Sequence, residues 1–447
     1  MSNIILQHGD VLTLDAEGRV LRDAAVAISG GTITAVGEIP ADFQADEIVD
    51  AAGHIVMPGF FNAHTHSAMT LFRGYAEDLP LDRWLNERIF PSESALTAED
   101  VYWGASLAAV EMIRGGTVGF ADHYFHMDRV AQVVMASGLR ANLAWGIFGR
   151  EEGEIGADLA EIAAFTEQWQ GAGDGRIRTM LGPHSAHTCT PQFLARTAAV
   201  AARLGVGIHI HLAELATEVE RSLALYDLRL VELLEANGVF EVPVLAAHAI
   251  YLADFEREIM AARGATAVQC PTTHMKLGYG VTPVPALLAA GVNVALGTDG
   301  AASNGRLDMF QEARHAALIQ KLSTLDATAM PGDIALRLAT QNGARALGFS
   351  LSGQIAAGLA ADLIMVDCSA PHFQPRHDLV ASVLYAAGSQ DVSDVMVAGK
   401  WLMRKRHLLT LDEERILDEV RRHTERLRLV ATPTRAVKLY PVTGLGA

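Results

Sequence analysis

The middle of the chain repeats one pattern, in which a short run of apolar and β-branched residues precedes a longer stretch rich in Ala and Leu. Each run follows Gly or another residue that interrupts regular structure, and each has the length of a buried strand. The eight runs are Ile55–Ala63, Thr117–Asp122, Leu139–Ile147, Ile177–Pro183, Val206–His211, Val242–His248, Ala265–Cys270 and Val292–Thr298. Eight alternating strands and helices predict a parallel (β/α)8 TIM-like barrel. An open doubly wound sheet is the alternative, but no glycine-rich dinucleotide motif follows the first strand to support it.

One of the predicted helices has clear signals at both ends. Thr97 is placed as an N-cap, and Asp100 follows it at the third helical position, which is the spacing of a capping box. The pair Gly115-Gly116 stands at the other end, where glycine commonly terminates a helix. We therefore expect a helix between these two signals.

The sequence pattern at the two ends of the chain differs from that of the middle, because short apolar runs typical of strands are separated there by turn residues. The expected strands are Asn3–Leu6, Ala25–Ile28, Thr32–Val36, Gly358–Val366 and Val392–Val397, and Gly30-Gly31 is a hairpin turn signal. Two β-rich ends around a different middle predict a small β-sandwich domain built from both chain termini. We assign residues 1–57 and 350–447 to this domain and residues 58–349 to the barrel.

Composition and charge exclude some classes of function. Half of the 447 residues are hydrophobic, which is enough for a large core, and the formal net charge is -17. Such an acidic chain without a basic stripe argues against binding to nucleic acid or to an anionic membrane. No apolar run is long enough to span a membrane, and the first 15 residues lack the features of a signal peptide. The three cysteines form no disulfide framework, so we expect a cytoplasmic protein.

Ionisable side chains gather at the carboxyl ends of the predicted strands. They are His64 and His66 after the first strand, His211 and Glu214 after the fifth, His248 after the sixth and Asp299 after the eighth. A barrel brings these ends to one mouth, where active sites form. Each signal alone has an ordinary explanation: His-x-His is often incidental, His248 could be a core residue, and Asp299-Gly300 could be a turn. Four separate strands ending in this way, inside a core that penalises buried charge, predict a site instead.

Several imidazoles and a carboxylate at one mouth indicate a metal. Three neutral imidazoles with one carboxylate suit Zn²⁺ or Fe²⁺ and leave one position for water. We expect one divalent cation, with zinc as the first choice and iron as the alternative.

The motifs at these strand ends resemble successive signatures of the amidohydrolase superfamily, and the resemblance covers nearly the whole chain. The motifs are Pro58-Gly59-Phe60-Phe61-Asn62-Ala63-His64-Thr65-His66, His211-Leu212-Ala213-Glu214, Ala247-His248, Gly297-Thr298-Asp299-Gly300 and Val397-Ala398-Gly399-Lys400-Trp401. The resemblance implies that the metal ligands are His64, His66, His211 and Asp299. It also implies a single metal, because Pro183-His184 stands where two-metal members carry a bridging lysine.

Roles for the remaining groups follow from the chemistry of such a centre. Water on the cation loses a proton near neutral pH, and Asp299 would accept that proton. Glu214 would act as a proton shuttle to the ring nitrogen beside the attacked carbon. It lies three residues after His211, which is one turn if a helix starts there. His248 would orient the hydroxide and stabilise the tetrahedral intermediate before ammonia leaves.

The segment after the first strand resembles the corresponding loop of the 5-methylthioadenosine/S-adenosylhomocysteine deaminases. The likeness covers Met69–Leu81, Trp84-Leu85 and Phe90-Pro91-Ser92-Glu93, with His184 farther along. It implies that Trp84 packs near the substrate and that Glu93 and His184 bind ribose hydroxyls. The implied activity is hydrolytic deamination of adenosine derivatives to the inosine analogue and ammonia. Without the resemblance, Trp84 could be simple helix packing and Glu93 a surface carboxylate.

Three departures from that family's pattern keep other substrates in view. The usual Asn-Pro-x-Ser-Asn-x-Lys-Leu is replaced by Cys270–Leu277, His187 stands where Tyr is common, and Trp145 lies near a position where some members carry a substrate-binding arginine. His274 is either an added pocket donor or a polar loop residue, and we prefer the loop residue. The alternative function is hydrolysis of another amino or chloro heterocycle, such as guanine, a pterin, cytosine or an s-triazine. A non-catalytic binding protein would have lost ligands that this chain retains. Oligomeric state is left open, a homo-oligomer included.

Overall fold

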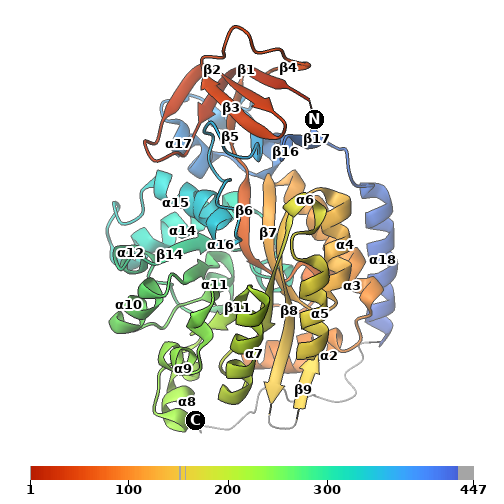
Figure 1. Cartoon of the computed structure of the whole chain (residues 1–447), viewed down its shortest axis with the longest axis vertical. Helices are drawn as coiled ribbons and strands as arrows, with labels where there is room; N and C mark the ends of the chain where they lie inside the picture. Colours follow the sequence, from red (N-terminus) through yellow and green to blue (C-terminus); the bar gives the residue numbers. More distant parts are fainter. Residues whose placement is uncertain (1, 151–152, 157, 431–447) are drawn as a thin grey trace.

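The computed structural model describes residues 2–150, 153–156 and 158–430, which form two sheets and the helices around them (Figure 1). The larger part is a barrel of eight parallel strands. In spatial order these strands are β6 (Phe60–Thr65), β7 (Thr117–Tyr124), β8 (Arg140–Arg150), β10 (Ile177–Pro183), β11 (Gly207–Leu212), β12 (Val244–His248), β13 (Thr266–Gln269) and β14 (Asn293–Leu296). The short strand β9 (Gly153–Gly156) extends β8 as an antiparallel hairpin. Each barrel strand overlaps one of the eight expected runs, so the barrel prediction is confirmed.

The last strand returns beside the first at the level of the expected site. The backbone N–H of Asp299 donates to the carbonyl oxygen of His64 at 2.9 Å. At Gly297 an added Cβ would lie 2.8 Å from the backbone nitrogen of His64, which is too close for any side chain. Glycine at this position therefore allows β6 and β14 to approach closely and brings their two site residues together.

The first expected strand is divided in the structure. Instead of one strand over Ile55–Ala63, β5 (His54–Pro58) belongs to the other sheet and β6 belongs to the barrel. The change falls at Gly59, where an added Cβ would lie 2.2 Å from Val118 of the neighbouring strand. The division depends on this tertiary contact and not on local hydrophobicity, which is continuous through the segment.

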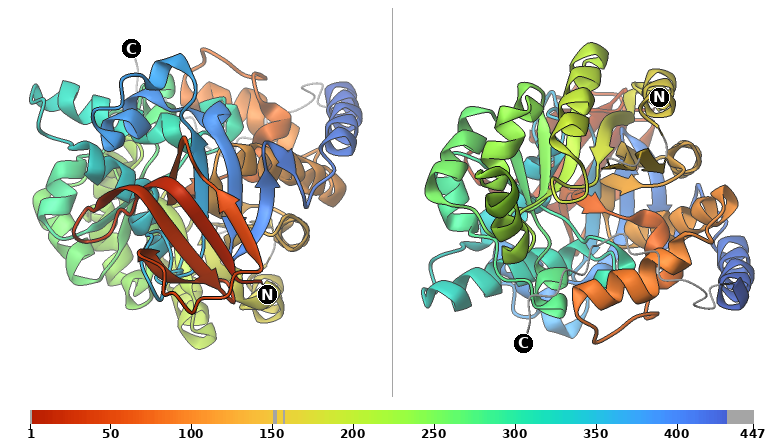
Figure 2. Two further views of the ribbon diagram at one scale, coloured as in Figure 1. Left: turned by 90° about the horizontal axis from the view of Figure 1, so that it is seen from above. Right: turned by 90° about the horizontal axis from the view of Figure 1, so that it is seen from below.

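Helices cover the outside of the barrel and link its strands (Figure 2). The principal ones are α3 (Ala98–Arg114), α4 (Met127–Ser137), α5 (Leu159–Trp169), α7 (Pro191–Leu204), α8 (Ala216–Tyr226), α9 (Leu230–Ala236), α10 (Asp254–Ala262), α11 (Pro271–Leu277), α12 (Val284–Ala289), α14 (Met309–Thr324), α15 (Gly332–Ala339) and α16 (Gln341–Ala346). The signals at the ends of α3 are confirmed, because Thr97 and Asp100 form a capping box and Gly115 is the C-cap.

Strands from both ends of the chain form the second sheet, which is mixed. Its members are β1 (Ile4–Leu12), β2 (Val20–Ser29), β3 (Thr32–Gly37), β4 (Glu47–Asp50), β5, β15 (Leu363–Asp367), β16 (Val392–Val397), β17 (Lys400–Arg404) and β18 (His407–Leu408). β5 pairs in parallel with β1 and antiparallel with β15, which joins the N-terminal strands to the C-terminal ones. The division into residues 1–57 with 350–447 and residues 58–349 stays a proposal that this strand composition supports.

The C-terminal helix α18 (Glu413–Val430) lies against the barrel helix α3 and not on the second sheet (Figure 1). Arg114 at the end of α3 forms an ion pair with Glu413. Farther along the same helices, Nδ1 of His423 lies 2.6 Å from a carboxylate oxygen of the buried Asp100. Among the helices described, none is both long and apolar enough to cross a membrane.

The second sheet covers one end of the barrel and leaves the other end for the site. In Figure 1 the strands of the second sheet lie at the top, and β8 runs downward away from them. Because the barrel strands are parallel, their carboxyl ends all meet at the opposite end, where TIM barrels place their active sites.

A buried ion pair connects the two sheets. Arg140, at the start of β8, donates two hydrogen bonds of 2.6 and 3.0 Å to Asp362, which directly precedes β15. Asp362 also accepts hydrogen bonds from the hydroxyl of Ser352 and the backbone N–H of Ala398. The side chain of Asp362 is fully buried, and its one carboxylate accepts all four of these hydrogen bonds.

Replacing Asp362 by Ala is expected to lower the free energy of unfolding by about 3–5 kcal/mol, because it leaves the buried Arg140 guanidinium without its counter-ion. Urea denaturation followed by circular dichroism measures the change. The control is Asp418→Ala, which removes an exposed carboxylate paired with Arg421 on α18 and should leave the midpoint unchanged. Equal midpoints for the two variants would contradict the assigned role of the ion pair.

Candidate active site

A pocket of about 690 Å³ opens at the carboxyl ends of the barrel strands. Most of the expected site residues line it, namely His66, Trp84, Glu93, His184, His211, Glu214, His248 and Asp299. His64 is fully buried, and its ring packs edge-on against those of His66 and His211 at centroid distances of 4.9 and 5.0 Å. The structure thus brings together the residues that the sequence placed at four different strand ends.

The backbone is strained where these strands end. His248 and Asp299 have φ angles of 74° and 62°, a left-handed region that residues other than glycine rarely occupy. Ala213 is similar, with a φ of 49°. Because of this turn no helix begins at His211 and α8 starts only at Ala216, so the condition for placing Glu214 one helical turn after His211 is not met. Glu214 nevertheless lines the pocket. The left-handed backbone at Ala213, and not a helical turn, therefore directs its side chain there.

Backbone carbonyls fix the orientation of two of the imidazoles. Nδ1 of His66 lies 2.5 Å from the carbonyl oxygen of His123, and Nδ1 of His211 lies 2.8 Å from that of His184. A carbonyl can only accept, so each Nδ1 carries the hydrogen and each Nε2 is bare in the neutral ring. These two Nε2 atoms face each other at 3.4 Å. Two bare nitrogens cannot hydrogen-bond to each other, but one cation satisfies both.

A third imidazole and a carboxylate complete the arrangement. Nε2 of His64 is buried and has no hydrogen-bond partner among the residues that the structure describes, and it lies 3.6 Å from Oδ1 of Asp299. The same oxygen is 3.2 Å from Nε2 of His66. Burial alone would raise the pKa of Asp299, but the neighbouring His64 and His66 hold that pKa well below its usual range. We call His64, His66, His211 and Asp299 the donor set. Three ring nitrogens and one carboxylate fit zinc or iron, whereas Mg²⁺ and Ca²⁺ prefer oxygen ligands.

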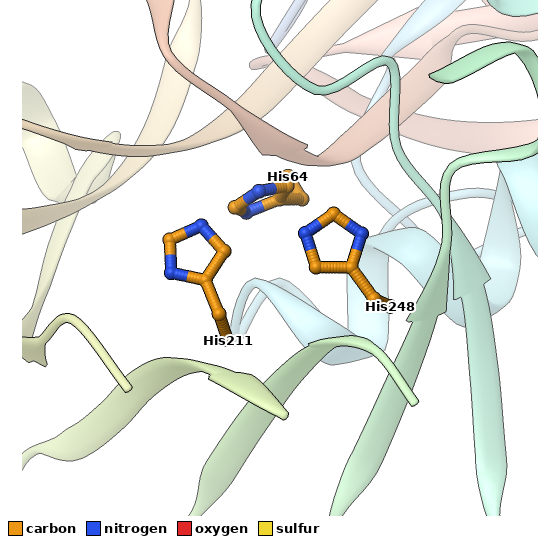
Figure 3. A group of neighbouring side chains, drawn as sticks. All are labelled: His64, His211 and His248. Atoms are coloured by element: carbon orange, nitrogen blue, oxygen red, sulfur yellow. The ribbon is translucent and has the colours of Figure 1, made fainter. Parts of the chain in front are cut away.

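His248 also points toward the donor set. Ring nitrogens of His64, His211 and His248 lie within 4.8 Å of one another, and the three rings converge in Figure 3. Nε2 of His248 is 3.7 Å from Oε1 of Glu214. Geometry alone therefore allows His248 to act either as a further ligand or as a hydrogen-bond donor to a bound molecule.

Glu214 is suited to carry a proton at neutral pH. Burial raises its pKa to about 8, and the negative charge of Asp299 adds to this effect. Its backbone N–H donates to Oε2 of Glu218 at 3.1 Å, which holds the segment against α8. The pocket thus contains a carboxyl group that binds a proton, Glu214, beside one that does not, Asp299. Opposite shifts of this kind mark acid and base partners.

Glu93 lies at the other side of the pocket, at the end of the short helix α2 (Phe90–Glu93). Oη of Tyr124 donates a hydrogen bond to its Oε1 at 2.7 Å. Burial raises the pKa of Glu93 to about 7. The lone pairs of its carboxyl oxygens that Tyr124 does not use can accept hydrogen bonds from hydroxyl groups of a ligand.

Aromatic rings form much of the remaining wall. Trp84 begins η2 (Trp84–Ile89), is buried, and donates from Nε1 to the carbonyl oxygen of Ala76 at 2.9 Å. His184 stacks on Phe148 at a centroid distance of 4.5 Å, and its Nδ1 lies 3.1 Å from Oγ1 of Thr188. These contacts hold the indole and the imidazole in fixed positions beside the pocket.

Sequence reasoning missed the residues that support the site from behind. The sequence assigns no role to Tyr124, which holds Glu93, although its place at the end of β7 is a usable signal. His209 and His274 contact the inner imidazoles of His64 and His248. The preference for His274 as a polar loop residue is wrong, because it lies on α11 and is 1% exposed.

Comparison with known proteins agrees with this geometry. The chain is 47% identical to the 5-methylthioadenosine/S-adenosylhomocysteine deaminase of Pelotomaculum thermopropionicum, over 96% of this chain and 99% of the relative. It is 45% identical to the 5'-deoxyadenosine deaminase of Methanosarcina mazei, with the same coverage. A crystal structure of an adenosine deaminase from Xanthomonas campestris with bound zinc superposes with a TM-score of 0.90 at 37% identity, over 95% of this chain and 98% of the other.

The barrel lies within one matching region, together with the strands β15 and β16 of the second sheet. A sequence model of the amidohydrolase family matches residues 55–402, which contain the donor set, Glu214 and His248. Since the match covers well over half of the chain, this protein belongs to the amidohydrolase family.

Proposed function

We propose that the protein is a metal-dependent hydrolytic deaminase of adenosine derivatives, acting on 5′-methylthioadenosine, S-adenosylhomocysteine or 5′-deoxyadenosine. The observation that carries the proposal is that the donor set, the proton-binding Glu214 and the half-buried Glu93 all face one pocket. The names of the relatives from Pelotomaculum and Methanosarcina support the same class of substrate.

The donor set would hold one cation, with zinc expected and iron as the alternative. The bound zinc in the Xanthomonas structure supports the choice of zinc. When bound, the cation lowers the pKa of a water molecule so that hydroxide is available near neutral pH.

The residues around the donor set would then move the protons. Asp299 accepts the proton of the attacking water, and Glu214 protonates the ring nitrogen next to the carbon that is attacked. A C–O bond forms at that carbon, and His248 would donate a hydrogen bond to the attacking oxygen and so orient it. The proton held by Asp299 passes to the amino group, the C–N bond breaks, and ammonia leaves. The hydroxyl proton that remains on the new oxygen returns to Glu214 as the carbonyl group forms. The products are the inosine analogue and ammonia.

The other side of the pocket would recognise the sugar. Glu93 and His184 would bind the two ribose hydroxyls, and Trp84 would pack against the bound nucleoside. The apolar residues Leu85 and Phe148 also line the pocket, and an apolar 5′-substituent suits such a wall.

Ammonia release from a panel of compounds tests the proposal. Methylthioadenosine, S-adenosylhomocysteine, 5′-deoxyadenosine and adenosine are compared with guanine, cytosine, a pterin and an s-triazine. We expect turnover of the nucleosides alone. Turnover of a free base or a triazine without any nucleoside would contradict the substrate assignment and leave the metal chemistry standing.

We expect one equivalent of divalent metal per chain after purification without chelator, measured by plasma mass spectrometry. His211→Ala should lose most of the metal and most of the activity together, because a site short of one ligand binds weakly. The exposed His407 on β18 provides the control, and His407→Ala should retain both. Two equivalents in the fully active protein would contradict the single-metal proposal.

Glu214→Gln keeps the shape of the side chain but removes the titrating proton. Turnover is expected to fall on the order of 100-fold or more, the usual scale for general acid–base catalysis, while metal content stays near normal. Glu220→Gln, at an exposed position on α8, is the matched control and should leave turnover unchanged. Full activity of Glu214→Gln would show that another group carries the proton.

The wild type is expected to prefer adenosine to 2′-deoxyadenosine by about 10- to 100-fold in kcat/KM, because a missing hydroxyl leaves a buried partner unsatisfied at roughly 1–3 kcal/mol. Glu93→Ala should remove most of this preference without changing metal content. Glu87→Ala, which removes an exposed carboxylate on η2, should keep it. An unchanged preference in Glu93→Ala would exclude Glu93 from ribose recognition.

A further inference from the structure

A second layer of histidines lies behind the candidate site. His274 is on α11 and is buried, and its Nε2 lies 3.1 Å from Nδ1 of His248. The other ring nitrogen of His248, Nε2, lies 3.7 Å from Oε1 of Glu214 in the pocket. His248 therefore connects a buried partner to the reacting groups through its two ring nitrogens.

The contact between His248 and His274 leaves only two arrangements of hydrogen. A hydrogen bond needs one donor and one acceptor, and the buried rings disfavour a charged form. If His248 donates from Nδ1, its Nε2 is bare and can bind a metal. If His274 donates from Nε2, Nε2 of His248 carries a hydrogen and can only donate. The tautomer of His248 thus decides between a metal ligand and a hydrogen-bond donor.

Three features favour donation by His274. The donor set already supplies three imidazoles and a carboxylate, which leaves room for water in a tetrahedral site. The carboxyl oxygen of Glu214 faces Nε2 of His248, where an N–H group is the better neighbour. Nδ1 of His274 is buried without a hydrogen-bond partner among the described residues. A bare nitrogen is easier to leave in that state than an N–H group, because unpartnered buried N–H groups are the rarer case.

His209 stands in the same relation to His64, with Nε2 at 2.8 Å from Nδ1. There the opposite arrangement applies, because His64 belongs to the donor set and needs a bare Nε2. Nδ1 of His64 must therefore donate to Nε2 of His209, which leaves the buried Nδ1 of His209 as an N–H group without a partner among the described residues. The number of ligands in the donor set thus outweighs the cost of one unpartnered N–H group in deciding these tautomers. The two outer histidines make similar contacts but set opposite tautomers on the inner rings.

We propose that His274 is a positioning residue that fixes His248 as the Nε2–H tautomer, which keeps His248 out of the metal's ligands and presents an N–H group to the oxygen that attacks the ring carbon. The proposal rests on the proposed function for the identity of that oxygen. The tautomer itself does not depend on which substrate is used.

The tautomer can be observed directly in the zinc-loaded protein. Nitrogen NMR of the protein labelled with ¹⁵N-histidine distinguishes a protonated ring nitrogen from a bare one, and comparison with His248→Gln assigns the signals of His248. We expect a hydrogen on Nε2 and none on Nδ1. A bare or metal-bound Nε2 in the wild type would overturn the proposal, and this result needs no variant of His274.

Variants of His274 test whether the tautomer matters for turnover. His274→Leu removes the donor, and we expect kcat for methylthioadenosine to fall about 10- to 100-fold, the usual scale for a supporting residue, with KM and metal content little changed. His274→Gln returns an amide N–H group and should recover most of kcat. Cys270→Ala, which opens space near the same two rings and keeps the donor, is the control and should leave kcat unchanged.

The outcomes separate the two proposals. Wild-type kcat in His274→Leu, or an equal loss of kcat in His274→Gln and His274→Leu, would contradict a role for the donated hydrogen. If none of the nucleosides is deaminated but Nε2 of His248 carries a hydrogen, the tautomer assignment is supported and only the proposed substrate is wrong.

Discussion

Bare imidazole nitrogens held against one another inside a barrel are the constraint on which the rest of this structure depends. Each buried nitrogen without a partner costs roughly 1–3 kcal/mol, so the arrangement must be enforced from outside. Hydrogen bonds from His66 and His211 to backbone carbonyls enforce it, together with left-handed backbone at His248 and Asp299. A bound cation would satisfy the same nitrogens, which links the stability of the barrel mouth to metal loading.

The same burial that makes the donor set costly also separates the roles of the carboxyl groups. Asp299 lies among imidazoles and stays ionised, whereas burial, together with the negative charge of Asp299, raises the pKa of Glu214 to about 8. Glu93, whose nearest polar partner is Tyr124, lies between these cases. One pocket therefore contains an anion, a proton donor and a hydrogen-bonding group for the ligand, and their environments account for the difference.

The order of strands and the placement of the donor set were predictable because both depend on local pattern and on one property of barrels, the gathering of strand ends. What could not be predicted depends on contacts between distant segments. The break at Gly59 needs Val118, and the position of α18 needs Asp100 to be buried beside His423. Polarity alone placed His274 in a loop, whereas the structure buries it because His248 supplies a partner.

The burial of His274 shows that polar side chains behind the pocket can contact the site residues without being exposed to water. A buried imidazole without hydrogen-bond partners destabilises the fold. A second imidazole satisfies one of its nitrogens, and the hydrogen bond between them fixes the orientation of both rings. Within the described part of the chain, His64 and His248, the two inner rings that touch an outer histidine, have no backbone carbonyl contact of the kind that orients His66 and His211. The outer layer therefore takes the place of the missing carbonyls. The barrel thus orients imidazoles by two means, and only an outer imidazole, which can either donate or accept, can set either tautomer.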